Sequence, residues 1–225
     1  MKIKWLAAFY CFVLITGAGS LTAKDLNLQF KDQYGKPLAN LVVEISFSTE
    51  KNEERVSKPD LKSGNQSYIM DQVDKAFKPE LLLIRQGDNV AFPNSDNIRH
   101  HVYSFSKAKP FELKLYSGRP TNPVTFPQHG VVTLGCNIHD SMVGFIYVAK
   151  SPSSFVTDSK GKIHLEKSKS ITSITAWHPH QKLAPERPQK MDLSKLSISG
   201  VTEYSIETRL PPVRDTFGAK FKDAQ

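Results

Sequence analysis

Hydrophobic and polar residues alternate with period two in several short segments of the chain, which is the pattern of half-buried β-strands. The clearest examples are residues 26–30, 41–47 and 111–116. Residues 81–84 form instead a continuous apolar run between turn-forming residues, which predicts a buried strand. Short strands at this spacing, with almost no helical periodicity, predict an all-β protein built as a sandwich.

The same reading predicts the remaining elements. Further strands are expected at residues 67–72, 89–92, 102–105, 131–134, 143–148 and 171–177, a hairpin at 155–165, and one or two strands between 196 and 207. Polar, turn-rich residues 49–66 predict a long exposed loop, 151–154 a linker, and 210–225 a loose tail.

The first 23 residues have the layout of a secretory signal peptide. Lys2 and Lys4 form a basic start, residues 5–15 an apolar run and residues 21–23 a cleavage site of small residues. The run is shorter than the roughly 20 residues that cross a bilayer, and no second run of that length follows. We therefore expect an exported, soluble mature protein with no integral membrane span; a retained amino-terminal anchor is the alternative.

Signal removal takes away two lysines and no acidic residue, so the formal charge falls from +8 to +6. A modest positive charge fits an acidic redox partner or an anionic surface, although most such charge simply solvates a protein. No stripe of basic and aromatic residues indicates nucleic-acid binding.

Signal removal also takes Cys11 away, which leaves Cys136 as the single cysteine. Exported thiols are usually paired in disulfides, so a lone thiol is expected to be protected, reactive or metal-bound. Two residues separate Cys136 from His139, and two more separate His139 from Met142. Thiolate and thioether are soft donors and imidazole suits both copper oxidation states, so this loop predicts a blue-copper site with Met142 as its weak axial ligand.

The fourth ligand is expected to be a histidine from a distant upstream strand, and His100 and His101 are the candidates. Adjacent strand residues point to opposite faces, so only one of them faces a metal. The alternatives to ligation are a buried free thiol at Cys136 and a core methionine at Met142.

His178 and His180 form a second histidine pair, on either side of Pro179. The pair could bind a second metal. Packing of Trp177, with the two histidines at its solvated edge, is the favoured reading.

Residues 130–148 resemble the last two strands of plastocyanin and amicyanin, which are cupredoxins, and the ligand spacing resembles the short amicyanin loop. Residues 92–102 resemble the family's upstream ligand segment, whose register implies His100 as the ligand. It puts His101 where the family has an asparagine that ties the ligand loops together. The resemblance thus implies one type 1 copper ion held by His100, Cys136, His139 and Met142.

Residues 24 to about 180 also resemble exported cupredoxin-domain proteins of Gram-negative bacteria that are labelled methylamine-utilization or plastocyanin-like. The matching segments are 92–96, 102–106, 136–139, 156–158 and 177–178. This resemblance implies a periplasmic location, while its label reflects a genomic association and not an activity.

The turn at 34–38, and residues 157–161 with the strand that ends at Trp177, resemble the two halves of a transthyretin-like or carboxypeptidase-regulatory-like β-sandwich. One predicted arrangement is a cupredoxin Greek-key β-sandwich inserted into this second sandwich. Its parts are a signal peptide at 1–23, the second sandwich at 24–65 and 151–210, the cupredoxin at 66–150 and a tail at 211–225. The alternative is a cupredoxin whose first strands are 25–47, followed by a separate carboxy-terminal domain.

Three functions are compatible with this reading. The leading one is a one-electron carrier between redox proteins, which is not an enzyme because the metal supplies the chemistry. The second is copper capture or delivery, although the mature chain has only three methionines and no Met or His tract. The third is a copper oxidoreductase, which Cys136 disfavours because no histidine adjoins it.

Overall fold

The structure is a computed structural model that describes residues 25–48, 65–119, 122–166, 170–197 and 200–210. The predicted signal peptide, almost all of the predicted 49–66 loop and almost all of the predicted tail lie outside these residues. The described residues form β-strands and a short 3₁₀ helix, η1 (Leu193–Lys195), so the all-β prediction is confirmed. Within this part of the chain, no helix is long and apolar enough to cross a membrane.

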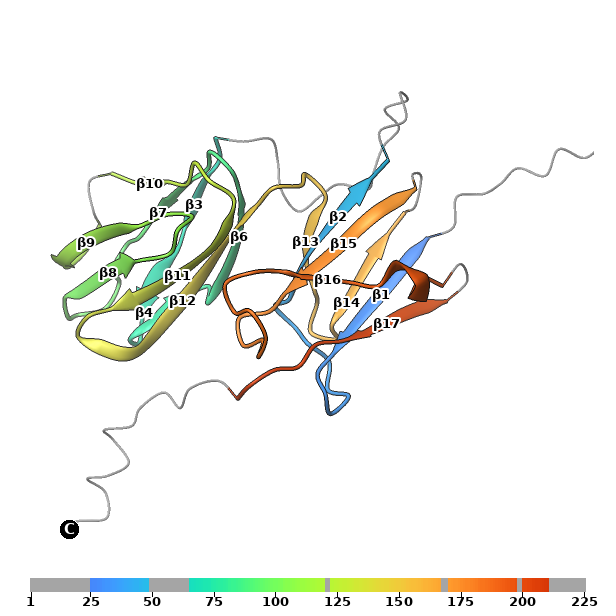
Figure 1. Ribbon diagram of the computed structural model, residues 1–225. Helices are drawn as coiled ribbons and strands as arrows, with labels where there is room; N and C mark the ends of the chain where they lie inside the picture. Colours follow the sequence, from blue (N-terminus) through green and yellow to red (C-terminus); the bar gives the residue numbers. More distant parts are fainter. Residues whose placement is uncertain (1–24, 49–64, 120–121, 167–169, 198–199, 211–225) are drawn as a thin grey trace, which may run out of the picture.

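The strands form two groups, and strands share sheets only within their own group (Figure 1). The first group, here called the outer sandwich, has sheets ordered β14-β1-β17 and β13-β2-β15-β16. Its strands are β1 (Leu26–Lys31), β2 (Val42–Phe47), β13 (Ser154–Val156), β14 (Lys162–Leu165), β15 (Ile171–Trp177), β16 (Gln189–Lys190) and β17 (Val201–Ser205).

The second group, here called the inner sandwich, has sheets ordered β10-β7-β3 and β6-β12-β11-β8-β9, and a separate β4-β5 ribbon. Its strands are β3 (Ser67–Ile69), β4 (Asp71–Val73), β5 (Ala76–Lys78), β6 (Leu81–Arg85), β7 (Asn89–Ala91), β8 (His100–Ser104), β9 (Phe111–Tyr116), β10 (Val124–Thr125), β11 (Gly130–Cys136) and β12 (His139–Ala149).

The chain enters and leaves the inner sandwich between β2 and β13, which are neighbours in the outer sandwich. Strands that precede residue 48 therefore pair with strands that follow residue 153. This is the connectivity of an inserted arrangement. The predicted domain boundaries, which imply that each part folds as a unit, stay a prediction.

Each sandwich has its own apolar core. Along β1, Leu26, Leu28 and Phe30 are buried while the residues between them are partly exposed, as period-two alternation requires. These side chains belong to the core of the outer sandwich, and a separate cluster with Phe92, Cys136 and other residues fills the inner sandwich.

A third apolar cluster joins the five-stranded sheet of the inner sandwich to the four-stranded sheet of the outer one. It consists of Val42, Leu83, Val131, Phe145, Tyr147, Ala149 and Trp177. Strand β12 is buried on both faces for this reason, because its even-numbered residues from 142 face the inner core and its odd-numbered residues from 145 face this junction. Both sheets of the junction are thus fixed to one another by apolar packing.

The hairpin predicted at 155–165 is wrong. Strand β13 pairs with β2 and β14 pairs with β1, so the intervening turn crosses from one sheet to the other. At this crossing Gly161, with φ +68°, lies so close to the backbone of Phe30 that a Cβ atom would meet the Phe30 carbonyl oxygen. Strands β1 and β2 are likewise in different sheets, although the 34–38 turn between them resembles that of a hairpin.

Candidate metal centre

The site lies at the end of the β11–β12 hairpin. Cys136 is the last residue of β11 and His139 the first of β12, and the two are paired across a two-residue turn. Strand β8 runs beside β11, with Tyr103 opposite Gly135. A Cβ at Gly135 would lie 2.8 Å from the Tyr103 ring, so the glycine lets β8 approach the ligand loop closely.

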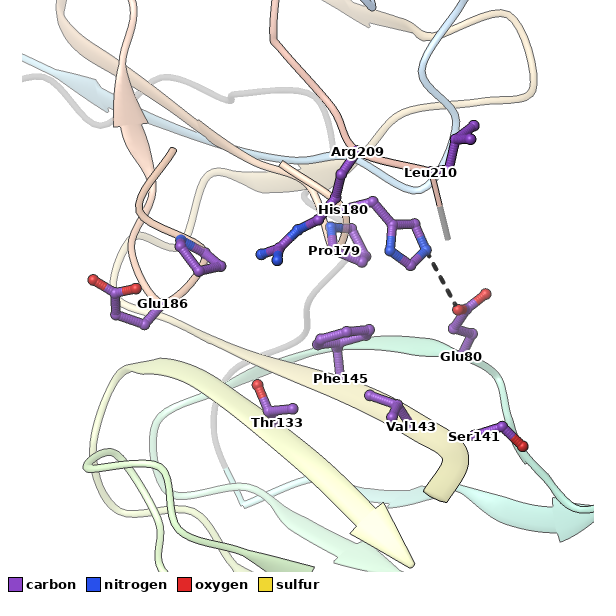
Figure 2. Close-up of a pocket in the computed structure, with 11 residues that line it drawn as sticks. Glu80, Thr133, Ser141, Val143, Phe145, Pro179, His180, Glu186, Arg209 and Leu210 are labelled. Atoms are coloured by element: carbon purple, nitrogen blue, oxygen red, sulfur yellow. Dashed lines mark ion pairs between the residues drawn. The ribbon is translucent and has the colours of Figure 1, made fainter. Parts of the chain in front are cut away.

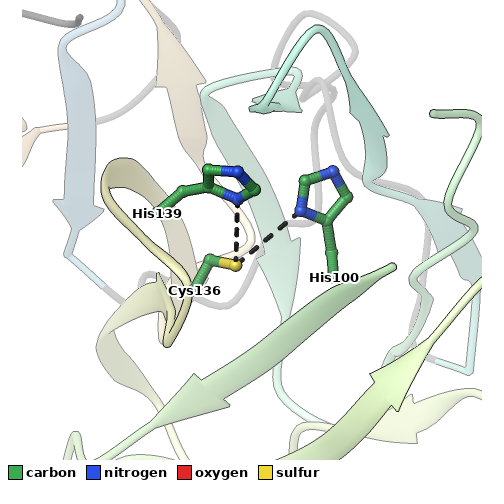
Figure 3. Close-up of side chains that lie close together, drawn as sticks. All are labelled: His100, Cys136 and His139. Atoms are coloured by element: carbon green, nitrogen blue, oxygen red, sulfur yellow. Dashed lines mark hydrogen bonds between the residues drawn. The ribbon is translucent and has the colours of Figure 1, made fainter. Parts of the chain in front are cut away.

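His100, the first residue of β8, completes the group. Cys136 Sγ lies 3.8 Å from Nδ1 of His100 and 3.8 Å from Nδ1 of His139, and both rings turn these nitrogens toward the sulfur (Figure 3). One ligand atom from each of the three residues lies within 4.8 Å of the others. His100 and Cys136 are buried, while His139 is partly exposed.

The spacing of these donors fits a metal ion. Bonds of about 2.0 Å to nitrogen and 2.3 Å to sulfur, in a trigonal plane, separate the two donors by about 3.7 Å. A trigonal set of two imidazoles and one thiolate is typical of blue copper. The donor set therefore fits copper, and the folded chain holds these donors at nearly the required separation.

The hydrogen bond from His100 to Asp96 determines which His100 nitrogen faces the sulfur. His100 Nε2 lies 2.6 Å from Asp96 Oδ2, and since a carboxylate oxygen accepts, Nε2 is the donating nitrogen and Nδ1 is the one that faces Cys136 Sγ. Burial by itself raises the pKa of the Asp96 carboxyl. Hydrogen bonds from the Lys75 backbone, from His100 and from the Asp74 backbone outweigh burial and lower that pKa below its ordinary value.

His139 is also held in the metal-binding form. Burial, followed by the proximity of His100, lowers the pKa of His139 below its ordinary value. The imidazole is therefore neutral at pH 7, which is the form that binds a metal.

Met142 lies within the apolar core beside the site. Its side chain is 1% exposed and belongs to the same buried cluster as Cys136. A thioether in this position is equally a core side chain, so axial ligation by Met142 stays a prediction.

His101 points away from the three donors. Its Nε2 lies 2.9 Å from Glu112 Oε1 on β9, and its ring is 5.5 Å from that of Tyr103. Alternation along β8 explains this direction. The contacts of His101 thus connect β8 to β9, and not the two ligand loops as the family's asparagine would.

The His178–His180 pair lies at the junction of the two sandwiches. His178 Nδ1 accepts a hydrogen bond from the His180 backbone, and His178 also bonds the Ala39 backbone. His180 lines a cleft of about 430 Å³ between the sandwiches, where its Nε2 lies 3.7 Å from Glu80 Oε1 (Figure 2). Among the described residues, only the His100 group brings three such ligand atoms together.

Asp96 is a site residue that the sequence reading did not single out. Asn94 holds its loop, donating through Nδ2 to the carbonyls of Ile98 and Tyr116 and accepting the Asp96 N–H. The available signal was an acidic residue four positions before a candidate ligand. Such residues are common in turns, so the position alone does not distinguish this role.

Comparisons with known proteins give structural neighbours only. No protein-family model matches the sequence, and no curated protein matches it. A copper-containing nitrite reductase from Thermus scotoductus is 25% identical with a TM-score of 0.35, and the match covers 37% of this chain and 22% of that one.

Two smaller neighbours are matched over nearly their whole length. A purple cupredoxin from Nitrosopumilus maritimus is 21% identical with a TM-score of 0.33, covering 37% of this chain and all of that one. A reduced Cu(I) form of an amicyanin mutant is 17% identical with a TM-score of 0.34, covering 48% and 98%. Their names agree with the cupredoxin resemblance of the sequence. Because these TM-scores are below 0.5, the assignment of the site rests on the side chains of this chain.

Proposed function

We propose that this protein binds one copper ion through His100, Cys136, His139 and Met142, and carries single electrons between protein partners in the periplasm. The observation that carries the proposal is the convergence of two imidazole Nδ1 atoms on the Cys136 sulfur. Bound copper would supply a one-electron couple at this position.

The residues around the donors suit electron transfer. Strands β8, β11 and β12 hold the donors in one sheet, which limits their movement when the charge of the site changes. His139 is the partly exposed ligand and follows Ile138, whose side chain is 51% exposed. An electron would therefore enter or leave through His139, at a surface with an apolar residue.

The net positive charge of the chain supports an acidic partner, since it falls only from +8 to +6 when the predicted signal peptide is removed. Beside the site the charges are balanced, because Lys75 and Lys78 line a surface hollow together with Asp74 and Asp96. A net positive charge speeds encounter with a negatively charged partner, and salt weakens the effect. The periplasmic location is supported by the predicted signal peptide.

Adding Cu(II) to the mature apoprotein tests the proposal, with visible absorption and electron spin resonance as readouts and Cys136→Ser as the matched variant. We expect an intense charge-transfer band with narrow copper hyperfine splitting, both lost in Cys136→Ser. A colourless protein that binds Cu(I) tightly would indicate copper capture or delivery instead. Failure to bind either ion would refute the metal site.

A further inference from the structure

The carboxylate of Asp96 meets His100 on the side opposite Cys136. The Asp96 Oδ2–His100 Nε2 distance is 2.6 Å, and the His100 side chain is fully buried. Asp96 also accepts backbone N–H groups of Asp74, at 2.7 Å, and Lys75, at 3.0 Å. The carboxylate is therefore fixed by three donors, of which one is the candidate ligand.

The two backbone donors come from the turn of the β4–β5 hairpin. Asp74 and Lys75 have φ of 54° and 56°, the left-handed conformation of a two-residue hairpin turn. This turn presents both N–H groups to one side, where the Asp96 carboxylate receives them.

The hairpin is in turn bound to the loop that carries Asp96. Ser95 Oγ donates to Asp71 Oδ2 at 2.7 Å, and Gln72 Nε2 donates to the Pro93 carbonyl at 3.0 Å. The β4–β5 ribbon shares no sheet with the strands that carry the three donors. Its described contacts with this loop make it a brace for the carboxylate.

We propose that Asp96, held by the β4–β5 turn, is a positioning residue that keeps the His100 proton on Nε2 and favours Cu(II) over Cu(I) at the site. The hydrogen bond makes Nε2 the donating nitrogen and leaves Nδ1 aimed at Cys136. A carboxylate bonded to a ligand imidazole makes that ligand more basic, and the negative charge stabilises the more positive ion. The effect on copper rests on the proposed function, whereas the effect on the His100 proton does not.

The first test needs no metal. Nitrogen-15 NMR of the apoprotein should show His100 as a single Nε2-protonated tautomer. In Asp96→Ala the Nδ1-protonated form should become detectable beside it, because the acceptor for Nε2–H is gone. A variant that is folded by its amide spectrum and keeps the single Nε2-protonated form would overturn the positioning role.

The second test measures Cu(II) and Cu(I) affinities and the reduction potential. Asp96→Asn keeps an oxygen acceptor and removes the charge, and we expect Cu(II) affinity to fall at least tenfold with a smaller change for Cu(I). Each tenfold loss of Cu(II) affinity relative to Cu(I) affinity raises the reduction potential by about 59 mV.

Glu112→Gln is the matched control, since it removes the charge of a carboxylate that is bonded to His101 and not to His100. We expect it to leave the potential nearly unchanged. An equal shift in both variants, or no shift in Asp96→Asn, would overturn the copper part of the proposal. A wild-type protein that binds no copper would refute the proposed function, and the His100 tautomer would still decide the positioning role.

Discussion

The contacts of each ring nitrogen give the histidines of this chain different roles. His100 donates through Nε2 and offers Nδ1 to the site, whereas His178 is bonded to the backbone around it. His101 adjoins His100 in sequence but faces Glu112. His100 and His101 thus share both the residue type and a carboxylate partner at Nε2, and only the direction of the other ring nitrogen, toward Cys136 in His100, separates the candidate ligand from its neighbour.

Burial of His178 predicts an acid-sensitive stability. Burial, followed by the proximity of His180, lowers the pKa of His178 to about 4 from 6.5. Between these values the unfolded chain binds a proton that the folded chain excludes. Stability is thus complete above about pH 6.5 and falls by about 2 to 3 kcal/mol as the pH decreases to 4.

Urea unfolding of the apoprotein at pH 7.5 and pH 4.5 measures this loss. His178→Asn is the matched variant, because its side-chain oxygen can accept the His180 N–H without titrating. We expect the free energy of unfolding to depend less on pH in the variant. The pKa of His139 is also lowered, but this residue is present in both proteins, so its contribution cancels in the comparison. Equal pH dependence in both proteins would contradict the assignment.

At the scale of elements, strand β12 is connected to β2 by a polar contact within the apolar junction. Glu44 accepts hydrogen bonds from the Tyr147 hydroxyl at 2.7 Å and from the backbones of Lys150 and Ser151 at 2.8 Å each. Burial raises the pKa of the Tyr147 hydroxyl, which therefore stays protonated and donates. One carboxylate thus fixes the end of β12 and the connection that follows it.

Glu44→Ala should lower the free energy of unfolding by about 2 to 4 kcal/mol, because several partly buried donors lose their acceptor together. Tyr147→Phe removes one donor and should cost about 1 kcal/mol. Chemical denaturation of both variants measures the two losses. A Glu44→Ala variant as stable as Tyr147→Phe would show that the backbone donors find other acceptors.

The strands and the ligand loop were predictable because their signals are local. Alternation marks β1 and β9, and one short turn carries Cys136 and His139. Which strands pair with one another was not predictable. A run such as 155–165 has the same pattern whether its two strands pair with each other or belong to different sheets. The residues alone left His100 and His101 open, and the register of the family resemblance favoured His100. The role of Asp96 was not predictable, because it depends on a contact with a hairpin turn 21 residues earlier.

At the scale of the whole molecule, Trp177 lies at the centre of the contact between the two sandwiches. Its side chain is fully buried, its ring centroid lies 5.6 Å from that of Phe145 and 5.8 Å from that of Tyr147, and Nε1 donates to the Pro185 carbonyl. Rings from both sandwiches meet here. We therefore expect the described parts of the molecule to unfold together.

Trp177→Ala should destabilise the protein by about 3 to 5 kcal/mol and separate this unfolding into two steps. Copper stabilises whichever unit binds it. Copper should therefore raise the midpoint temperature of the single unfolding transition in the wild type, and the midpoint temperature of only one of the two transitions in the variant. Differential scanning calorimetry with and without copper measures this.

Phe126→Leu, a change within the inner core, is the control and should keep a single transition. If Trp177→Ala also unfolds in one copper-sensitive step, the junction cluster is not what couples the two sandwiches.

The connection from β12 back to β13 also has a mechanical consequence. The chain returns to the outer sandwich at β13, where Ser154 pairs with Glu44. The packed junction opposes rotation of the inner sandwich about this attachment. Strand β12 then extends His139 roughly 30 Å from the attachment. The candidate metal centre thus lies at the far end of a rigidly held strand. Electron exchange is therefore expected to depend on encounter with a partner and not on movement of the inner sandwich relative to the outer one.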